Sequence, residues 1–365
     1  MSLWVVYCLL IFINFMADFY IIRLLLLSAG AFIFTMAWTP LLTNFLYRHK
    51  LGKTIRNNGS TPIFSKLHAA KSGTPTMGGV LIWVTVLIFA LGLALVHWLW
   101  PNSWLGELNF LSRSQTYLPL GILVFAALVG LFDDWLDVRG LGTKGGGGLT
   151  VKVRLLIYTL IALVGALWFY FKLGWDTFHV PFLGNFNLGW WYIPVFVIII
   201  VSTAFSVNET DGLDGLAGGT LLGSFMVYSV LSFLTGRYDL AAFCGVIGGA
   251  LLAFLWFNIN PARFYMGDTG SMSLGITLGV IAMLTNTALI LPVIGLIFVI
   301  ESLSVIIQVV SKKLRHGRKV FLSAPIHHHL EAKGWPEPKI VMRFWVIAAV
   351  SGALGICLFL LDHSW

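Results

Sequence analysis

The chain has 365 residues, of which 58% are hydrophobic and only 10% are charged. Soluble domains carry about 25% charged residues, so this composition excludes an ordinary soluble protein. The mean hydropathy is +0.89 and the formal net charge is +8. The sequence predicts an all-α polytopic membrane protein with a single integral membrane domain over residues 1–365.

Apolar runs long enough to cross a bilayer recur along the chain, separated by short polar stretches. A transmembrane helix needs about 20 predominantly apolar residues. Ten spans are predicted, at residues 20–46, 77–100, 117–136, 151–171, 190–207, 216–235, 240–257, 271–286, 288–311 and 343–361. Residues 1–17 are apolar but short, and we interpret them as an interfacial helix, with an eleventh span as the alternative.

The basic residues predict the orientation, because cytoplasmic loops retain Lys and Arg. One face receives 19 of the 23 basic residues, which lie in the stretches 48–76, 137–154, 258–270 and 312–343. The predicted cytoplasmic loops are 48–76, 137–152, 208–216, 258–270 and 312–342. With ten spans, both termini are expected on the periplasmic side. The positive charge indicates insertion topology and anionic lipid headgroups, and no nucleic-acid partner is expected.

Acidic residues follow three of the spans, all at their predicted cytoplasmic ends. The stretches are "VGLFDDWLD" from residue 129, "NETDGLDGLAGG" from residue 208 and "FYMGDTGS" from residue 264. Adjacent helical residues do not face each other, so Asp133 and Asp134 would diverge unless the helix ends there. The charged, glycine-rich stretch that follows indicates that the third span ends at these acids. Asp214 and Asp268 also precede apolar runs, where helix capping is an alternative role.

Carboxylates near membrane depth usually face a polar cavity, because burying them in lipid is costly. Mg²⁺ takes one or two carboxylates and completes its shell with water and phosphates. We therefore expect a Mg²⁺ site, with solvated loop acids as the alternative. Lys71, Thr76 and Lys152 add polar groups on the same face, and Glu301 and Gln308 lie on one face of the ninth span.

Three consecutive histidines, His327, His328 and His329, stand in "APIHHHLEAKGWPEP". Zinc ligands on a helix are commonly spaced i, i+4, so adjacent rings do not converge easily on one ion. We interpret this stretch as an anion-binding element in the loop between spans nine and ten. Proton transfer is an alternative, because histidine titrates near neutral pH.

Acids, cationic groups and glycine-rich loops at one membrane face suit the chemistry of a diphosphate. A metal and nearby cations neutralise the charge that develops during phosphoryl transfer. The nucleophile from the bilayer would be a lipid phosphate, whose second pKa of about 6 leaves it largely dianionic. A secondary transporter is the alternative class, but its sites lie near the bilayer midplane and often between repeated halves.

The motifs "DDW", "NETDGLDGLAGG", "FNINPARFYMGDTGS" and "APIHHHLEAKGWPEPKIVMRFW" resemble those of the phospho-N-acetylmuramoyl-pentapeptide transferases. This family belongs to the polyprenyl-phosphate N-acetylhexosamine-1-phosphate transferases, and the resemblance runs from Leu51 to Trp345. It implies a homodimer in the bacterial inner membrane, surrounded by membrane lipid. The implied enzyme transfers phospho-MurNAc-pentapeptide from UDP-MurNAc-pentapeptide to undecaprenyl phosphate, forming lipid I and UMP.

The resemblance also assigns roles to residues. Asp268 corresponds to the Mg²⁺ ligand, and catalytic roles fall on Asp133, Asp134, Asp268 and His327. The positions that correspond to substrate-binding residues are Lys71, Thr76, Lys152, Asn208, Asp211, Asp214, Asn258, Tyr265, Gln308, Ala324, His328 and His329. Tyr265 stands where the family usually has a phenylalanine stacked on uracil, and tyrosine keeps the aromatic face.

The chain departs from the family pattern at Asp137, where a lysine is usual, and at Glu209, where the usual residue is apolar. Lys144 and Arg139 are the nearest residues that would supply the missing charge. A related enzyme that uses UDP-GlcNAc with the same lipid acceptor is the nearest alternative function.

Overall fold

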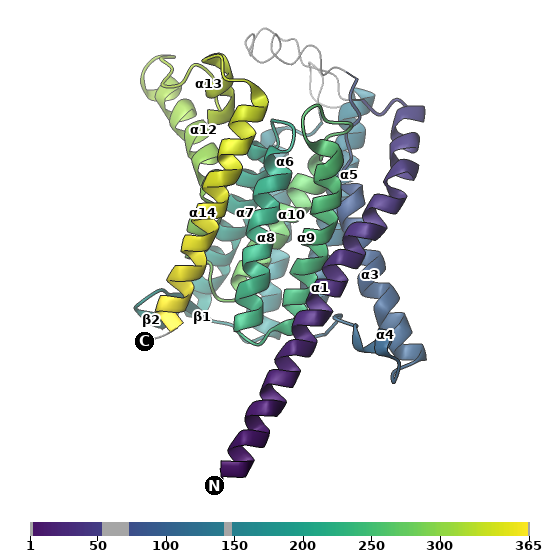
Figure 1. Ribbon diagram of the computed structural model, residues 1–365. Coiled ribbons are helices and arrows are strands. Elements are labelled where there is room, and N and C mark those ends of the chain that lie inside the picture. The colour runs from purple at the N-terminus through teal and green to yellow at the C-terminus, as the bar shows by residue number, and fades with distance from the viewer. Residues whose placement is uncertain (1–2, 53–72, 142–147, 364–365) are drawn as a thin grey trace.

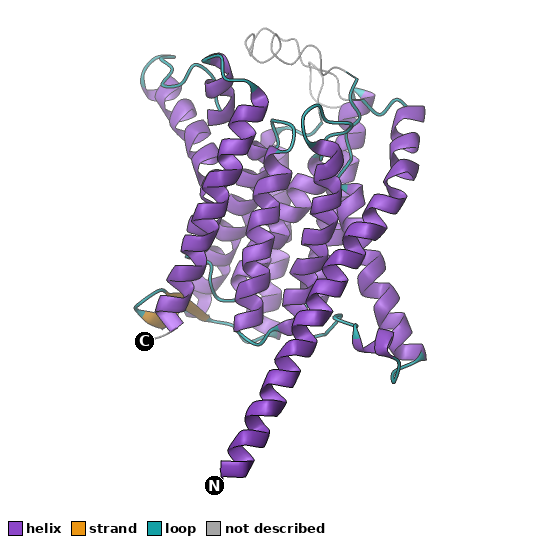
Figure 2. Cartoon of the chain, viewed as in Figure 1, coloured by secondary structure: helices purple, strands orange, loops and turns teal. Residues whose placement is uncertain are grey.

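The computed structural model describes residues 3–52, 73–141 and 148–363, with side chains from residue 18 onward. Almost every regular element is a helix (Figures 1 and 2), which confirms the predicted all-α membrane fold. The long helices are α1 (Leu3–Arg48), α3 (Val80–Leu99), α5 (Tyr117–Arg139), α6 (Val151–Leu167), α7 (Tyr192–Thr210), α8 (Leu216–Leu234), α9 (Tyr238–Asn258), α10 (Asp268–Leu284), α12 (Leu296–Leu314) and α14 (Glu337–His363). The short helices are α4 (Trp104–Glu107), α11 (Leu291–Ile294) and α13 (Ile326–Ala332), with a π-helical turn at Trp168–Lys172 and a 3-10 turn at Gly189–Trp191.

Each of the ten predicted spans overlaps one of the long helices. In the described residues, eight helices are long and apolar enough to cross a membrane, and α10 is a shorter apolar helix. The predicted span 288–311 is wrong as one continuous helix. It is divided at Gly295 into α11 and α12, and glycine is a poor residue for continuing a helix.

Helix α1 runs without interruption for 46 residues and projects beyond the other helices at its N-terminal end (Figure 1). Residues 3–17 form its first part and are not a separate helix. Their position at a membrane interface stays a prediction.

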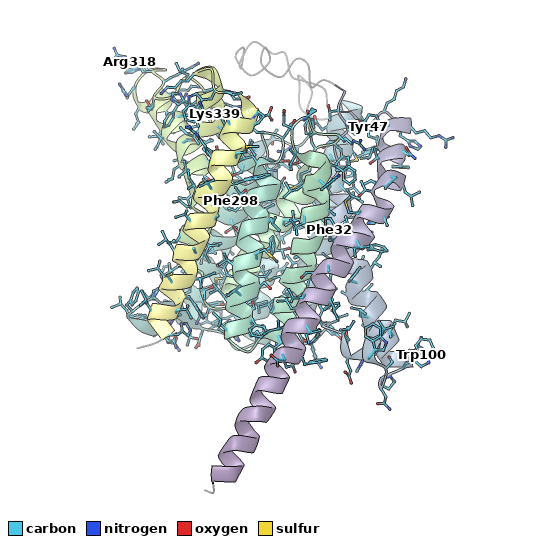
Figure 3. The ribbon with its side chains drawn as sticks, viewed as in Figure 1. Phe32, Tyr47, Trp100, Phe298, Arg318 and Lys339 are labelled. Carbon is cyan, nitrogen blue, oxygen red and sulfur yellow. The ribbon has the colours of Figure 1, made fainter. Side chains whose placement is uncertain are left out.

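Helices α9 and α10 lie at the centre of the bundle. Every α10 residue from Thr269 to Leu284 is buried, and α10 packs against α5 and α7. Large apolar side chains instead cover the outside of the bundle, as Figure 3 shows. This arrangement fits a bundle surrounded by lipid, whose outward face does not need to be polar.

The two chain ends lie on the same side of the bundle, and α13 lies at the opposite end (Figure 1). A two-stranded antiparallel hairpin, β1 (Thr177–Val180) with β2 (Gly184–Asn187), lies on the side of the termini. The sequence analysis did not predict this hairpin. Arg318 and Lys339 lie at the end that carries α13, whereas Trp100 lies at the other end (Figure 3).

Candidate active site

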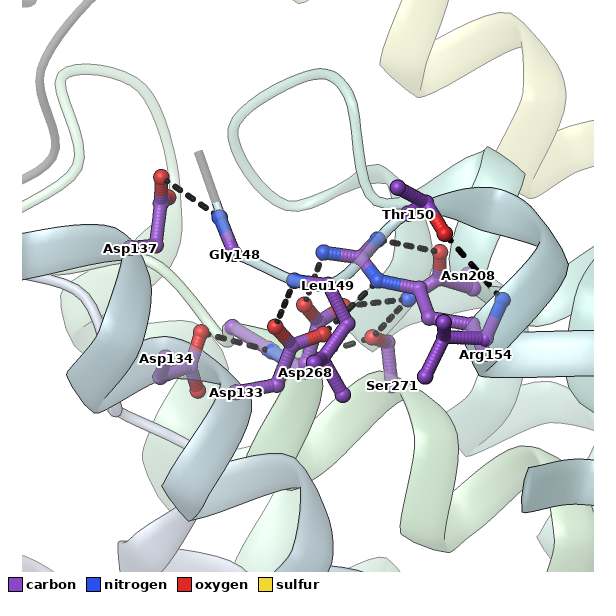
Figure 4. A network of polar contacts seen from close by, with 12 residues as sticks. Asp133, Asp134, Asp137, Gly148, Leu149, Thr150, Arg154, Asn208, Asp268 and Ser271 are labelled. Atoms are coloured by element: carbon purple, nitrogen blue, oxygen red, sulfur yellow. Dashed lines mark hydrogen bonds and ion pairs between the residues drawn. The ribbon is translucent and has the colours of Figure 1, made fainter. Parts of the chain in front are cut away.

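Asp133 and Asp134 lie inside α5, which continues to Arg139. The expectation that the helix ends at these acids is therefore wrong. Because adjacent helical side chains diverge, the two carboxylates contact different partners, as Figure 4 shows. Both are buried, with relative exposures of 2% for Asp133 and 3% for Asp134.

The Asp133 carboxylate is bound by the residues that begin α6. Its Oδ2 accepts a hydrogen bond from Nε of Arg154 at 2.7 Å, and its Oδ1 accepts one from the backbone N–H of Leu149. The neighbouring Gly148 permits this approach, because a Cβ there would overlap the Asp133 carboxylate. Gly148 also donates its backbone N–H to Asp137 at 3.1 Å.

Arg154 connects Asp133 to Asp268. Its second terminal nitrogen lies 2.7 Å from Oδ2 of Asp268, while its Nε contacts Asp133. A planar guanidinium presents several donors in fixed directions, which suits it to join two carboxylates. The sequence analysis counted Arg154 only as a topology charge, so the structure adds it to the candidate site.

Asn208, at the end of α7, completes this cluster. Its Nδ2 donates to Oδ1 of Asp268 at 2.5 Å and contacts Oγ of Ser271 at 3.0 Å. Arg154 approaches Oδ1 of Asn208 at 3.4 Å. We call Asp133, Arg154, Asn208 and Asp268 the acid–arginine cluster. These contacts bring Asp133, Asn208 and Asp268 together.

Asp134 binds the N-terminus of α10. Its Oδ1 accepts the backbone N–H of Asp268 and its Oδ2 that of Thr269, each at 3.0 Å. A carboxylate is favourable there, because the first N–H groups of a helix lack partners within the helix. Gly130, one turn earlier on α5, lets the two helices approach, since a Cβ there would overlap the Asp268 carbonyl. Asp134 therefore fixes the position of Asp268.

Thr76 and Tyr265 lie beside this helix end. The Thr76 hydroxyl lies 3.4 Å from Oδ1 of Asp134. The backbone of Tyr265 bonds to both sides of the same segment, donating to Pro75 at 2.8 Å and accepting from Gly78 at 2.7 Å. Lys71, the other predicted residue of this segment, lies outside the described residues.

Asp214 and Asn258 join the loops that follow α7 and α9. Oδ2 of Asp214 accepts the backbone N–H of Ala262 at 3.1 Å. Asn258 accepts the N–H of Gly215 at 3.0 Å and donates to the Phe264 carbonyl at 2.8 Å. The N-cap position of α8 is held by Gly215, with a φ of +83° and no side-chain cap. The alternative role of Asp214 as the cap of that helix is therefore wrong.

The three histidines lie on α13, a short helix within the predicted connection between spans nine and ten. Nδ1 of His327 lies 2.9 Å from Oε2 of Glu301, and Nδ1 of His328 lies 2.7 Å from Oε2 of Glu331. His329 differs, because its Nδ1 accepts the backbone N–H of Leu322 at 3.1 Å. We call Glu301, His327, His328 and Glu331 the histidine cluster.

His327 is completely buried, at 0% exposure. Burial lowers its pKa, but the charge of Glu301 and its hydrogen bond raise the pKa more, so the net direction is upward. Its Nε2 has no hydrogen-bond partner among the described residues. That nitrogen lies against Gly212, where a Cβ would overlap the ring.

Gln308 and Ala324, the other two residues predicted near the histidines, lie outside the histidine cluster. Gln308 binds the segment that precedes α13, since its Oε1 accepts the N–H groups of Val320 and Phe321, each at 3.0 Å. Its Nε2 donates to the Phe321 carbonyl at 2.8 Å. Ala324 is half-buried, two residues before α13.

Two further predicted residues border the acid–arginine cluster in sequence. Lys152 is exposed in the first turn of α6, and Asp211 is half-buried directly after α7.

The burial of His329 and the charge of Lys333 lower the pKa of His329. It is therefore neutral at a pH where His327 still carries a proton.

Helix α12 and the C-terminal end of α7 connect the acid–arginine cluster to the histidine cluster. Helix α12 carries Glu301 and, at the next position, Ser302, whose hydroxyl contacts that of Ser206 at 2.5 Å. Ser206 lies two residues before Asn208 on α7. Gly212, which faces His327, lies four residues after Asn208. The acid–arginine and histidine clusters are thus attached to the same end of α7.

The acid pair fits a hard divalent cation. Asp133 and Asp268 bring two carboxylates, the hard oxygen ligands that Mg²⁺ takes, to one shared cationic group. Within the described part of the chain, no three His, Cys, Asp or Glu side chains converge as a ligand set. An ion that keeps water or substrate oxygens as ligands, as Mg²⁺ does, suits such a small set.

Comparisons with known proteins agree with this arrangement. The signature 1 of phospho-N-acetylmuramoyl-pentapeptide-transferase matches residues 71–82, and the model of Glycosyl transferase family 4 matches residues 116–286. A phospho-N-acetylmuramoyl-pentapeptide-transferase from Chloroflexus aggregans is 40% identical over 94% of this chain and 91% of its own. A relative with the same name from a Geobacillus species is 39% identical, over 89% of this chain and 94% of its own.

Proposed function

This chain belongs to the phospho-N-acetylmuramoyl-pentapeptide-transferase family, and on that premise we propose the reaction that it catalyses. It transfers phospho-MurNAc-pentapeptide from UDP-MurNAc-pentapeptide to undecaprenyl phosphate. The products are lipid I and UMP. The single observation that carries the proposal is the convergence of Asp133 and Asp268 on Arg154, at the helix ends that also carry the family motifs.

In this reaction, an oxygen of the lipid phosphate attacks the phosphorus that carries the sugar. The bond from that phosphorus to the bridging oxygen breaks, and UMP leaves with the oxygen and its electron pair. The main obstacle is to bring two anions together, and not to create a strong nucleophile. Cationic and hydrogen-bonding groups at the site are therefore more important than a strong general base.

We propose that Asp268, assisted by Asp133, holds Mg²⁺. The ion supplies positive charge that neutralises the diphosphate and the developing charge on the leaving phosphate. Arg154 and Asn208 hold the Asp268 carboxylate from two sides, at 2.7 and 2.5 Å. Asp134, bound to the backbone of α10, is the residue that positions Asp268.

His327 is proposed to bind an anionic oxygen of the substrate. Its Nδ1 contacts the Glu301 carboxylate, so Nδ1 carries a proton, and Nε2 has a proton to donate only in the imidazolium form. The raised pKa of His327 favours that form near neutral pH. His328 and His329 extend the same helix, and Lys152 adds a cation at the start of α6.

The remaining family positions shape the nucleotide-sugar site in this proposal. Tyr265 stacks on uracil, with Lys71 and Thr76 beside it. The bonds of Asp214, Asn258 and Gln308 indicate that these residues hold the surrounding loops in place. Asn208, Asp211, Ala324 and His328 border the sugar phosphate. Glu209 adds a further acid next to Asn208 in sequence.

The cellular setting is part of the same proposal. The multi-pass bundle lies in the bacterial inner membrane, with the α13 end in the cytoplasm and both termini in the periplasm. The enzyme acts as a homodimer in peptidoglycan synthesis. The soluble donor then meets the lipid acceptor at the inner leaflet.

The proposal is tested by UMP release from UDP-MurNAc-pentapeptide, using purified protein, undecaprenyl phosphate and Mg²⁺. We expect UMP and lipid I in equal amounts, and no release when UDP-GlcNAc replaces the donor. UMP release from UDP-GlcNAc alone would instead identify the related enzyme. Movement of a solute into proteoliposomes without any UMP release would identify a transporter.

A further inference from the structure

A groove of about 720 Å³ lies between α5 and α6, and its lining begins one helical turn from the acid–arginine cluster, at Val129 and Ile157. Its walls on α5 include Tyr117, Gly121 and Phe125. Its walls on α6 include Leu160 and Val164, and Trp168 of the following π-helical turn continues that wall. Arg113, directly before α5, is the only charged residue in the lining. The groove is therefore an apolar channel with one cation.

The groove has the depth of one bilayer leaflet. It extends along α5 from Tyr117 to Val129, which corresponds to about 18 Å at 1.5 Å per residue. The hydrocarbon core of a bilayer is about 30 Å thick, so one leaflet contributes about half of that. The end that carries Arg113 lies toward the chain termini, because α5 runs from that side to Asp133.

Gly121 leaves open space in the wall of the groove. Glycine in a helix interior is unfavourable by about 1 kcal/mol relative to alanine. A close neighbour usually explains such a glycine, as it does at Gly130. At Gly121, however, a Cβ would meet no described atom within 4 Å. No packing against the described residues requires the glycine, and its absent side chain widens the groove.

The mouth of the groove carries groups that suit a lipid headgroup. Arg113 is exposed, and no described residue forms an ion pair or a side-chain hydrogen bond with it. Tyr117 and Trp168 are about half exposed, at 53% and 48%. Such aromatic residues are typical of the membrane–water interface. An exposed guanidinium that shares a groove with two interfacial aromatic residues favours a phosphate with net negative charge.

We propose that this groove is a binding site for an anionic diacyl phospholipid of the leaflet on the side of the chain termini. The phosphate pairs with Arg113, and one acyl chain lies over Gly121 and Phe125 toward Val129. Lipid bound there fills the space between α5, which carries Asp133, and α6, which carries Arg154. The site is separate from the transfer reaction and does not depend on the proposed function.

The test is native mass spectrometry of the full chain in detergent, titrated with palmitoyl-oleoyl phosphatidylglycerol or with the phosphatidylcholine of the same chains. We expect tighter binding of phosphatidylglycerol to the unmodified protein. Arg113→Gln should weaken that binding about fivefold, because one basic residue near anionic headgroups contributes about that factor. Arg113→Lys should retain most of the affinity.

Gly121→Leu places a bulky side chain in the groove, where its Cβ meets no described atom within 4 Å, and should weaken the binding of both lipids. Gly92→Leu on α3 is the matched control, because a Cβ at Gly92 also meets nothing within 4 Å. It should leave binding unchanged. Equal binding of the two lipids, or unaltered binding by Arg113→Gln and Gly121→Leu, would overturn the proposal. So would undecaprenyl phosphate that binds more tightly with the same dependence on Arg113 and Gly121, since the groove would then hold the acceptor.

Discussion

The two clusters at the α13 end of the bundle use different cations to hold their carboxylates. In the acid–arginine cluster, Asp133 and Asp268 share the guanidinium of Arg154, which stays charged at all physiological pH values. In the histidine cluster, Glu301 and Glu331 each contact one imidazole. Histidine loses its charge near neutral pH. The cation of the first cluster is therefore permanently charged, whereas the charge on the imidazoles of the second depends on pH.

Exposure separates Asp268 from the pair formed by His327 and Glu301. The Asp268 side chain retains 15% exposure, whereas His327 and Glu301 are at 0%. A partly exposed carboxylate is accessible to a metal and a soluble substrate. The buried pair of His327 and Glu301 instead fixes the direction of Nε2 of His327, because water cannot easily replace either partner in their hydrogen bond. In the proposed function, the first cluster therefore binds the reacting groups and the second orients a hydrogen-bond donor.

The largest effect is expected from the exposed carboxylate. Asp268→Asn should reduce turnover at least about 1000-fold, because it removes a negative charge at the proposed metal position. The measurement is the initial rate of UMP release over a range of Mg²⁺ concentrations. Lys50→Asn is the control, since Lys50 is exposed with a φ of 51°, which asparagine tolerates. Appreciable Mg²⁺-dependent turnover by Asp268→Asn would refute the metal role.

A smaller loss is expected when the shared guanidinium becomes an ammonium. Arg154→Lys keeps the charge but loses the fork that contacts both acids. The expected loss is about tenfold in turnover, which corresponds to one charge-assisted hydrogen bond. Steady-state kinetics should show the loss in kcat more than in KM. A rate equal to that of the unmodified protein would show that Arg154 does not hold the two carboxylates for catalysis.

The pH dependence of the reaction rate distinguishes the role of the histidine cluster from that of the acid–arginine cluster. Glu301→Gln preserves an acceptor for Nδ1 of His327 but removes the charge that raises its pKa. Activity that requires the imidazolium falls as pH rises through the His327 pKa. The alkaline limb of the rate profile should therefore move to lower pH in Glu301→Gln, while the rate at the acidic plateau changes little.

The same pair makes a pH-dependent contribution to stability. Because the folded pKa of His327 is raised, the contribution is complete below the unfolded value and is lost as pH rises through the folded value. Thermal unfolding should thus show a larger destabilisation by Glu301→Gln at low pH than at high pH. An unshifted rate profile together with a pH-independent destabilisation would contradict this role for Glu301.

The smallest effect is expected at the aromatic residue beside the clusters. Tyr265→Phe keeps the stacking face and removes only the hydroxyl, so the KM for the nucleotide donor should change by less than about twofold. Tyr265→Ala removes the face and should raise KM without a matching loss in kcat. A large effect of Tyr265→Phe would show that the hydroxyl contacts the substrate.

The sequence alone was sufficient to predict the helices and the convergence of the acids. Long apolar runs determine the spans, and acids that follow several spans on one face must lie at one end of the bundle. The same reasoning did not identify Arg154, because a basic residue near a helix start is also the usual topology signal. Only the contacts with Asp133 and Asp268 distinguish it from Lys152.

Short elements were the other limit of sequence reasoning. Helix α13 has 7 residues, and each hairpin strand has 4. Such lengths contain too few residues for a periodic pattern to be read. The end of the third span was misplaced for a different reason. Asp133 and Asp134 remain helical because Arg154 and the first N–H groups of α10 satisfy them, and those partners are remote in sequence.

The central claim is that the two clusters form one site, and a double-mutant cycle on turnover tests it most directly. The rates of Arg154→Lys, Glu301→Gln and the double variant are compared at a pH where His327 is protonated in the unmodified protein and at a higher pH. Residues that act on the same transition state are not additive, whereas independent sites are. The predicted result is a double variant that departs from the product of the single effects, with a departure that changes with pH. Strict multiplicativity at both pH values would contradict the account.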